Sequence, residues 1–299
     1  MKTFIILLFL TCMSLPCVGV CPSADLTGDC RVNFADLAVL ASQWLTEGFP
    51  DIDGMVWIQI DDPGVDEDGD GTPDHEGFNG EMSKYEITNA QYCQYLNAAK
   101  DSGDIVVDSN DVKGISGPYS GQTYYNLAGA GIYYDNAANG GAARIYWTGS
   151  AFSVDSGFES HPVTYVSWYG AKAFASYCGW RLPTEWEWQA VADYDGSYIY
   201  GCGTEIDNGI ANYYGSYHPD GTTVVGAFGA YGYGMCDMTG NVSEWTDSCY
   251  YADCDPNDRI LRDGGWASFS FVCKVSYRTP ASPMGSGDVN SNIGFRVCR

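Results

Sequence analysis

Positively charged side chains are scarce in this chain of 299 residues, which has 14 lysines and arginines against 38 aspartates and glutamates. The formal net charge is therefore −24 at pH 7. Such a surface repels phosphate backbones, so the composition argues against nucleic acid as a partner. Acidic clusters of this density are typical of solvated surfaces and of calcium sites.

The sequence has one long apolar run, near its beginning, and no second one. Residues 1–20 have the pattern of a secretory signal peptide, because Lys2 precedes the apolar run Phe4–Leu10 and small residues near Gly19 allow cleavage. A lipoprotein anchor is a weaker alternative, since no suitable small residue precedes the nearby cysteines. No later stretch approaches the about 18 apolar residues that a spanning helix needs. We therefore expect a secreted, periplasmic or cell-surface protein with no transmembrane segment.

Cys-x-x-Cys pairs are absent, which argues against a metal–thiolate cluster. The chain has 12 cysteines, and Cys12 and Cys17 would leave with the signal peptide, so ten remain (12 − 2 = 10). An even number of cysteines in an exported protein favours disulfides. Cys249 and Cys254 are candidates for a local bridge, whereas most of the connectivity cannot be deduced from the sequence.

The segment 25–36 has the oxygen-ligand spacing of a calcium loop that leads into a helix. The expected ligands are Asp25, Thr27, Asp29, the carbonyl of Arg31, Asn33 and Asp36. Residues 21–47 resemble one half of a type I dockerin repeat, and this resemblance implies a cohesin-like partner. Cys30 replaces the usual turn glycine and no second repeat follows. The alternative is a plain acidic linker before a helix.

A second acidic stretch follows the turn-rich linker 48–54. Calcium-loop positions 1, 3, 5 and 9 are matched there by Asp66, Asp68, Asp70 and Asp74. No carboxylate occupies position 12 of this loop. The pattern favours calcium slightly over a flexible acidic loop.

Regular elements are expected to be short. Met55–Ile60 is typical of a first strand, and the runs 144–148 and 151–154 of a hairpin. Capping boxes at Thr88 and Thr184 each predict the start of a helix. A further helix is expected to begin after Ser167 and to end near residue 179.

Six phrases in a fixed order resemble the formylglycine-generating enzyme, or sulfatase-modifying factor, domain. They are KYEITNAQY (84–92), HPV followed by VSW (161–168), RLPTEWEW (181–188), YGMCDMTGNVSEW (233–245), RDGGW (262–266) and IGFRV (293–297). The resemblance covers residues 55–299. It implies an α+β fold, C-type-lectin-like, with little regular secondary structure.

The resemblance also implies two structural calcium ions. The first ion would be held by the Asn212 side chain, the Tyr213 carbonyl, the Asp220 side chain and the Thr222 carbonyl. The second ion would use carbonyls near Asp237, Gly240 and Val242 and the Glu244 carboxylate. Carbonyl and carboxylate oxygens are the ligands that calcium prefers. A disulfide between Cys178 and Cys298 is implied as well.

Catalytic members of this family oxidise a sulfatase cysteine to formylglycine with copper held by two cysteines. Between residues 265 and 278 this chain has only Cys273. Five positions to either side stand Ser268 and Arg278, neither of which is a substitute ligand for a soft ion. Cys273 is therefore the single catalytic candidate. The preferred interpretation is a disulfide with Cys202 or Cys236.

Two functions remain open. The first is a non-catalytic binding protein whose C-terminal segment recognises a peptide, protein or glycan, since aromatic and small polar side chains suit adaptable recognition. The expected ligand-binding residues are Trp266, Ser268, Phe269, Phe271, Tyr277 and Asn292. At least half of these aromatic side chains are expected to be ordinary core. The second function is a formylglycine-generating oxidase with a rearranged copper site.

Overall fold

The computed structural model describes residues 50–64, 76–127, 143–214, 221–251, 258–283 and 291–299. Chain contacts place residues 52–299 in one unit and residues 1–51 in another. The predicted calcium loops at 25–36 and 66–74 lie outside the described residues, as does the signal peptide. In the described part, no helix is both long and apolar enough to cross a membrane.

The helices begin at the hydroxyl residues that the sequence indicated. Helix α3 (Asn89–Asp101) and helix α5 (Glu185–Asp193) each start with a complete capping box, on Thr88 and Thr184. Helix α4 (Trp168–Tyr177) is capped by the Ser167 hydroxyl, which accepts the Gly170 N–H. A side-chain oxygen at each start satisfies backbone donors that have no partner within the helix.

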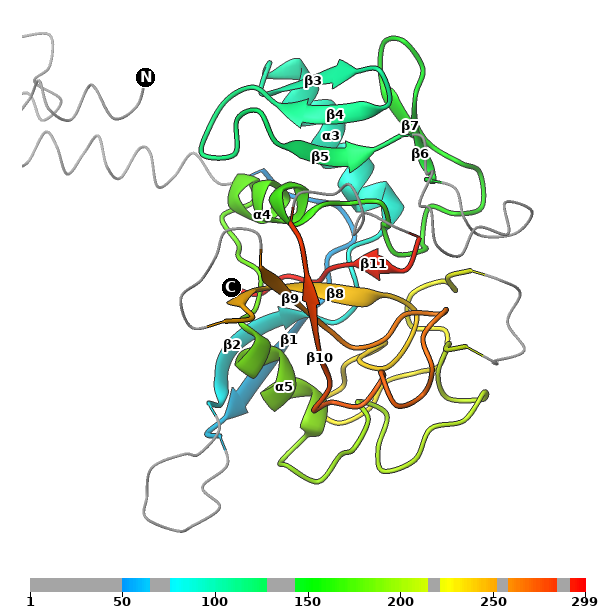
Figure 1. Ribbon diagram of the computed structural model, residues 1–299. Coiled ribbons are helices and arrows are strands. Elements are labelled where there is room, and N and C mark those ends of the chain that lie inside the picture. Colours follow the sequence, from blue (N-terminus) through cyan, green and yellow to red (C-terminus); the bar gives the residue numbers. More distant parts are fainter. Residues whose placement is uncertain (1–49, 65–75, 128–142, 215–220, 252–257, 284–290) are drawn as a thin grey trace, which may run out of the picture. The chain divides into compact units, whose positions relative to one another are not determined.

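Short strands form small sheets around these helices (Figure 1). Strands β1 (Trp57–Asp62) and β2 (Phe78–Ser83) pair antiparallel, as do β6 (Ile145–Trp147) and β7 (Phe152–Val154). A three-stranded antiparallel sheet contains β3 (Ile105–Asp108), β4 (Asp111–Gly114) and β5 (Thr123–Asn126). The fourth sheet has the order β10-β9-β8-β11 and comprises β10 (Arg278–Ala281), β9 (Arg259–Arg262), β8 (Ser243–Cys249) and β11 (Ile293–Gly294).

Most of the described chain lies in loops, which confirms the expected α+β fold with little regular structure. Two apolar clusters hold it together. The larger cluster packs aromatic side chains of α3 and α4, and Tyr92 is stacked on Phe174 with ring centroids 5.8 Å apart. The smaller cluster surrounds Trp188 of α5 and the β1–β2 pair.

A fully buried ion pair joins the C-terminal strand region to β8. Arg296 donates hydrogen bonds to both carboxylate oxygens of Glu244, with Nε–Oε2 and Nη2–Oε1 distances of 2.7 Å. The same guanidinium donates to the carbonyls of Ser83, Cys236 and Asp237. Arg296 thus connects β2, the loop before β8 and the chain's end through one group.

Replacing Arg296 by Gln should lower the free energy of unfolding by about 3 kcal/mol or more, because Glu244 would be left as a buried charge without a partner. Urea unfolding, followed by tryptophan fluorescence in the presence of a chelator, measures the change.

The matched control is Arg299→Gln, since Arg299 pairs with Glu81 at the surface, where both side chains are more than a third exposed. An exposed pair contributes less than about 1 kcal/mol. Equal losses in the two variants would contradict the structural role of Arg296.

Candidate functional site

The segment 263–277 links β9 to β10 and runs, in orange, through the irregular part of the chain in Figure 1. Backbone groups fix it at several points. The Trp266 N–H donates to the Asn241 carbonyl at 2.8 Å, and the Tyr214 N–H donates to the Ser268 carbonyl at 2.8 Å. The Val275 N–H donates to the Ile199 carbonyl at 2.9 Å. The course of the segment therefore depends little on its own side chains.

Four exposed rings gather on this segment and its neighbour, and we call them the aromatic surface. Tyr214, Phe269, Phe271 and Tyr277 have exposed fractions of 59%, 56%, 52% and 38%. Their ring centroids form a continuous series: 4.9 Å from Tyr214 to Phe269, 5.9 Å from Phe269 to Phe271, and 6.0 Å from Phe271 to Tyr277. Contiguous exposed apolar groups of this kind are typical of interaction sites.

The structure brings together only part of the predicted ligand-binding set. Trp266 is partly buried and donates its indole N–H to the Ser291 carbonyl at 2.9 Å. Ser268 and Asn292 are also partly buried. The expectation that at least half of the aromatic side chains are core is wrong, because three of the four are exposed.

Tyr214 was not singled out by the sequence. It lies about 50 residues before the segment, and the backbone bond to Ser268 and the ring contact with Phe269 bring the two together. No local signal distinguishes such a ring from the other tyrosines of the chain, so long-range contacts were needed to find it.

Cys273 lies beneath this surface with 0% of its area exposed. Its thiol is close to the carbonyl oxygens of Gly264 and Phe269, at 3.7 and 3.8 Å. Burial raises the pKa of this thiol, and Asp263 raises the pKa further. A side chain on Gly264 would come within 2.8 Å of the sulfur, so the packing here is close. Cys273 is therefore a protonated structural thiol.

The preferred disulfide from Cys273 to Cys202 or Cys236 is corrected by the structure, in which all three are free thiols. The Cys273 sulfur points to carbonyl groups of its own segment instead. Cys202 is partly exposed, and burial raises the pKa of its thiol to about 11.

Two further cysteine predictions have different outcomes. Cys298 is a buried free thiol that lies 3.7 Å from the Arg181 carbonyl, so the structure does not contain the Cys178–Cys298 bridge. Cys178 caps the end of α4. Cys249 is disulfide-bonded, while its predicted partner, Cys254, lies outside the described residues.

The first implied calcium site is described only in part. The Asn212 side chain is buried and donates to the Gly221 carbonyl at 3.0 Å, which places it beside the Thr222 backbone. Tyr213 is partly exposed, and Asp220 lies outside the described residues. The residues described here fit a site built on loop carbonyls.

The second implied calcium site surrounds the buried Glu244 carboxylate, and the calcium assignment there stays a prediction. Both Glu244 oxygens and the Asp237 carbonyl are bound by the Arg296 guanidinium. The Trp188 indole N–H also donates to Glu244, at 2.8 Å. Gly240 and Val242 complete the loop between them, and Val242 is fully buried. Among the residues with described positions, no group of three or more His, Cys, Asp or Glu side chains is arranged to hold a metal ion.

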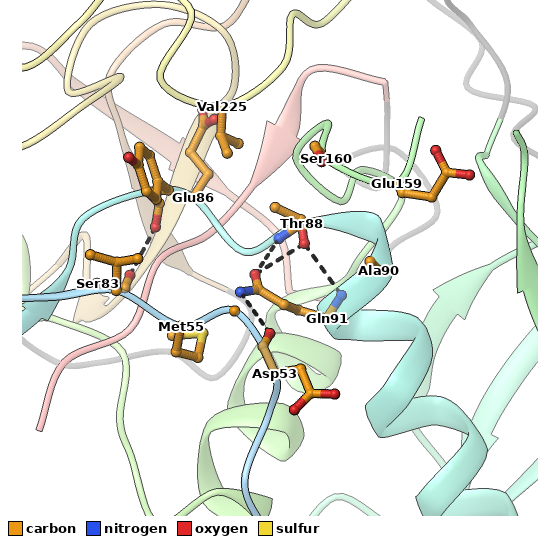
Figure 2. Close-up of a pocket in the computed structure, with 13 residues that line it drawn as sticks. Asp53, Met55, Ser83, Glu86, Thr88, Ala90, Gln91, Glu159, Ser160 and Val225 are labelled. Atoms are coloured by element: carbon orange, nitrogen blue, oxygen red, sulfur yellow. Dashed lines mark hydrogen bonds between the residues drawn. The ribbon is translucent and has the colours of Figure 1, made fainter. Parts of the chain in front are cut away.

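A cavity of about 260 Å³ opens beside the start of α3 (Figure 2). Three carboxylates line it, those of Asp53, Glu86 and Glu159. The Glu86 carboxylate accepts hydrogen bonds from the Asn241 amide at 2.7 Å and from the Val242 N–H at 3.2 Å. Burial raises the pKa of Glu86, and Asp237 and Glu244 raise it further. The most buried acid of this cavity thus holds the loop before β8 in place.

The described helices, small sheets and extensive loops, with an aromatic surface in place of paired cysteines, define a protein of the formylglycine-generating-enzyme-like fold class. The match to the sulfatase-modifying factor enzyme 1-like domain covers residues 54–299. The chain belongs to this family.

Relatives of this chain differ in the functions that their names state. The chain is 35% identical to the serine/threonine-protein kinase pkn1 of Chlamydia caviae over 56% of this chain, which spans only 28% of that protein. It is 34% identical to the inactive C-alpha-formylglycine-generating enzyme 2 of Bos taurus, over 45% of this chain and 49% of the relative. Identity to the formylglycine-generating enzyme of Mus musculus is 26%, over 84% of this chain and 74% of the relative.

Solved structures support the fold. The structure of CarF is 20% identical, with a TM-score of 0.57 over 83% of this chain and 98% of that chain. The Treponema denticola variable protein 1 is 18% identical, with a TM-score of 0.51 over 82% of this chain and 94% of that chain. At these identities the likeness shows the fold alone.

The burial of Cys273 predicts that iodoacetamide leaves this thiol unmodified in the folded protein at pH 8. Cys202 should react slowly there, and its rate should increase about tenfold per pH unit up to pH 9.5, because the thiolate is the reactive form and its pKa is about 11. Peptide mass spectrometry after timed labelling measures both rates. N-acetylcysteine is the reference, and its labelling rate should level off at a lower pH than that of Cys202.

Rapid labelling of Cys273 at neutral pH would show an accessible thiolate and would contradict a structural role. A urea-unfolded sample, in which both cysteines should react, is the control for labelling efficiency.

Proposed function

We propose that this protein is a secreted, non-catalytic member of the sulfatase-modifying factor family that binds a ligand through its aromatic surface. The observation that carries this proposal is the continuous series of four exposed rings on segment 263–277 and its neighbour. The segment carries one cysteine where catalysis requires a pair, and that cysteine is fully buried. Soft thiolate ligands select Cu(I), and this segment offers a single buried cysteine.

The exposed rings proposed to bind the ligand are not the side chains that form the apolar core. Phe269 and Phe271 are both more than half exposed, so their side chains contribute little to the apolar core. Their stacked rings, with an interplanar angle of 12°, present a rigid apolar surface at low entropic cost. Rigid aromatic anchors of this type dominate binding energy at interfaces.

The double variant Phe269→Ser/Phe271→Ser should therefore keep the wild-type unfolding temperature within about 2 °C and lose ligand binding by about tenfold or more. Binding is measured with peptides selected from a displayed library against the wild-type protein. The matched control is Tyr251→Ser, which removes a ring that is 62% exposed and outside the aromatic surface. Unchanged binding in the double variant would contradict the proposal.

The alternative function is a formylglycine-generating oxidase with a rearranged copper site, and the formylglycine-generating enzyme of Mus musculus among the relatives favours it. The discriminating assay incubates the purified protein with copper, oxygen and a Cys-x-Pro-x-Arg peptide. We expect no aldehyde product. Formylglycine that forms with the wild type and is lost in Cys273→Ser would establish the oxidase instead.

Calcium is proposed as a structural ion at the loop that contains Asn212 and Thr222, supported by the buried Asn212 side chain beside the Gly221 carbonyl. Ligand binding to the folded state raises stability by mass action. An unfolding temperature that chelation leaves unchanged would contradict this. The spacing of residues 25–36 supports a further proposal of calcium binding in a dockerin-like module with a cohesin-like partner.

A further inference from the structure

Positive charges in this fold lie largely on aromatic rings. Most of the described lysines and arginines are placed over a ring face. The guanidinium carbon of Arg144 is 3.7 Å from the centre of the Phe158 ring. Arg299 lies 4.3 Å from the centre of the Trp57 ring, although its side chain is 43% exposed. A ring face carries the negative part of the aromatic quadrupole and therefore attracts an ammonium or guanidinium group.

The aromatic surface has no such cation of its own. Among the residues that the structure describes, no lysine or arginine lies over any of its four rings. Arg278 is bound by both oxygens of Glu185 and lies over other rings. Lys274 is partly buried and is bridged to Tyr200 through the backbone. The four rings are thus exposed without a cation from the described chain.

Ring faces are open at both ends of the aromatic surface. Tyr214 and Tyr277 are the end rings, tilted by 72° and 70° from their phenylalanine neighbours. In an edge-to-face pair one ring uses only its edge, so its faces stay free of that contact. Exposed fractions of 59% and 38% show that solvent reaches both tyrosines. Phe269 and Phe271 stack on one another between them and offer an apolar contact.

The charge of the whole chain favours a positive ligand. Acidic residues outnumber basic ones by 38 to 14, which gives a net charge of −24. Such a field attracts cations and repels acidic polypeptides, phosphates and a second copy of this chain alike. Close to the surface, burial raises the pKa of Tyr213, the neighbour of Tyr214, and the Asp207 carboxylate raises it further. Charge complementarity therefore favours a basic occupant.

From the open tyrosine faces and the acidic field we infer that the aromatic surface binds a basic polypeptide segment. In this complex an arginine or lysine of the segment lies on one of the two end tyrosines, while an apolar side chain packs on Phe269 and Phe271. The inference rests on the proposed binding function and adds the chemistry of its ligand. Residues 264–283 contain no aspartate or glutamate, so on this segment the rings themselves have to hold the cation.

The test selects linear peptides of about 12 residues from a displayed library against the full chain and measures synthetic copies by fluorescence polarisation. Selected peptides should have a positive net charge, with Arg or Lys near an apolar residue. Replacement of that Arg or Lys by Gln should weaken binding by about threefold or more. A rise in salt from about 0.05 M to about 0.5 M should weaken it by about tenfold, because long-range attraction is screened.

The double variant Tyr214→Leu/Tyr277→Leu separates the electrostatic role of the rings from their apolar area. Leucine keeps an apolar side chain but has no quadrupole, so binding of the basic peptides should fall by about threefold or more. Tyr251→Leu is the matched control, because it removes a ring that is 62% exposed and outside the aromatic surface. The control should bind like the wild type, and both variants should keep the wild-type unfolding temperature within about 2 °C.

Scrambled peptides distinguish this site from general attraction to an acidic protein. They have the same composition and charge as the selected peptides and should bind about tenfold more weakly. Scrambled copies that bind equally well would overturn the inference. Selected peptides that bind the double tyrosine variant as tightly as the wild type would overturn it too.

The remaining outcomes separate the ligand's chemistry from the proposed function. Neutral or acidic peptides that need Phe269 and Phe271 would overturn the basic ligand and leave the proposed function standing. Peptides that bind the Phe269→Ser/Phe271→Ser variant as tightly as the wild type would overturn the proposed function itself. Spermine that binds through the tyrosines, with no peptide selected, would overturn a polypeptide as the ligand class.

Discussion

The buried pair between Arg296 and Glu244 is the interaction on which the rest of this structure depends. Most of the described chain is loop, so ordinary ladders of backbone hydrogen bonds are too few to determine its course. A single guanidinium supplies donors in a fixed planar fork, and here they reach the carboxylate and carbonyls from β2 and the loop before β8. This one side chain thereby holds together segments that are far apart in the sequence.

The Arg296 charge also partly offsets the burial of three acids nearby, because it acts to lower the pKa of each. Glu86, Asp237 and Asp263 are each almost fully buried, and burial raises the pKa of all three carboxyls. Backbone N–H groups and the Asn241 amide satisfy much of their hydrogen-bonding capacity, although one oxygen of Asp263 has no partner among the described atoms. The backbone is also strained at this place, since Asp237, Asn241 and Asp263 all have positive φ.

Local patterns in the sequence were sufficient for the elements that local physics controls. The N-caps at Thr88, Ser167 and Thr184 gave each helix its start, because the caps act on backbone groups only a few residues away. The ordered phrases gave the family over residues 54–299. Aromatic packing supports the loops where regular structure is sparse, as the rings around Tyr92 show.

Long-range features escaped the same reasoning. The free thiol of Cys273 depends on how its segment folds back over the sulfur, and spacing between cysteines carries no such information. The place of Tyr214 in the aromatic surface depends on long-range contacts to Ser268 and Phe269. The contact between Glu244 and Arg296 joins residues 52 positions apart in the sequence, and the phrase that contains Glu244 carries no sign of it.

The anchoring of segment 263–277 by main-chain groups has a consequence for how this protein can change over time. Its contacts with Asn241, Tyr214 and Ile199 use amide and carbonyl groups that every residue except proline provides. The side chains at positions 269, 271 and 277 point outward and can be exchanged while the loop keeps its course. The structure therefore allows substitution at these outward positions without a new fold.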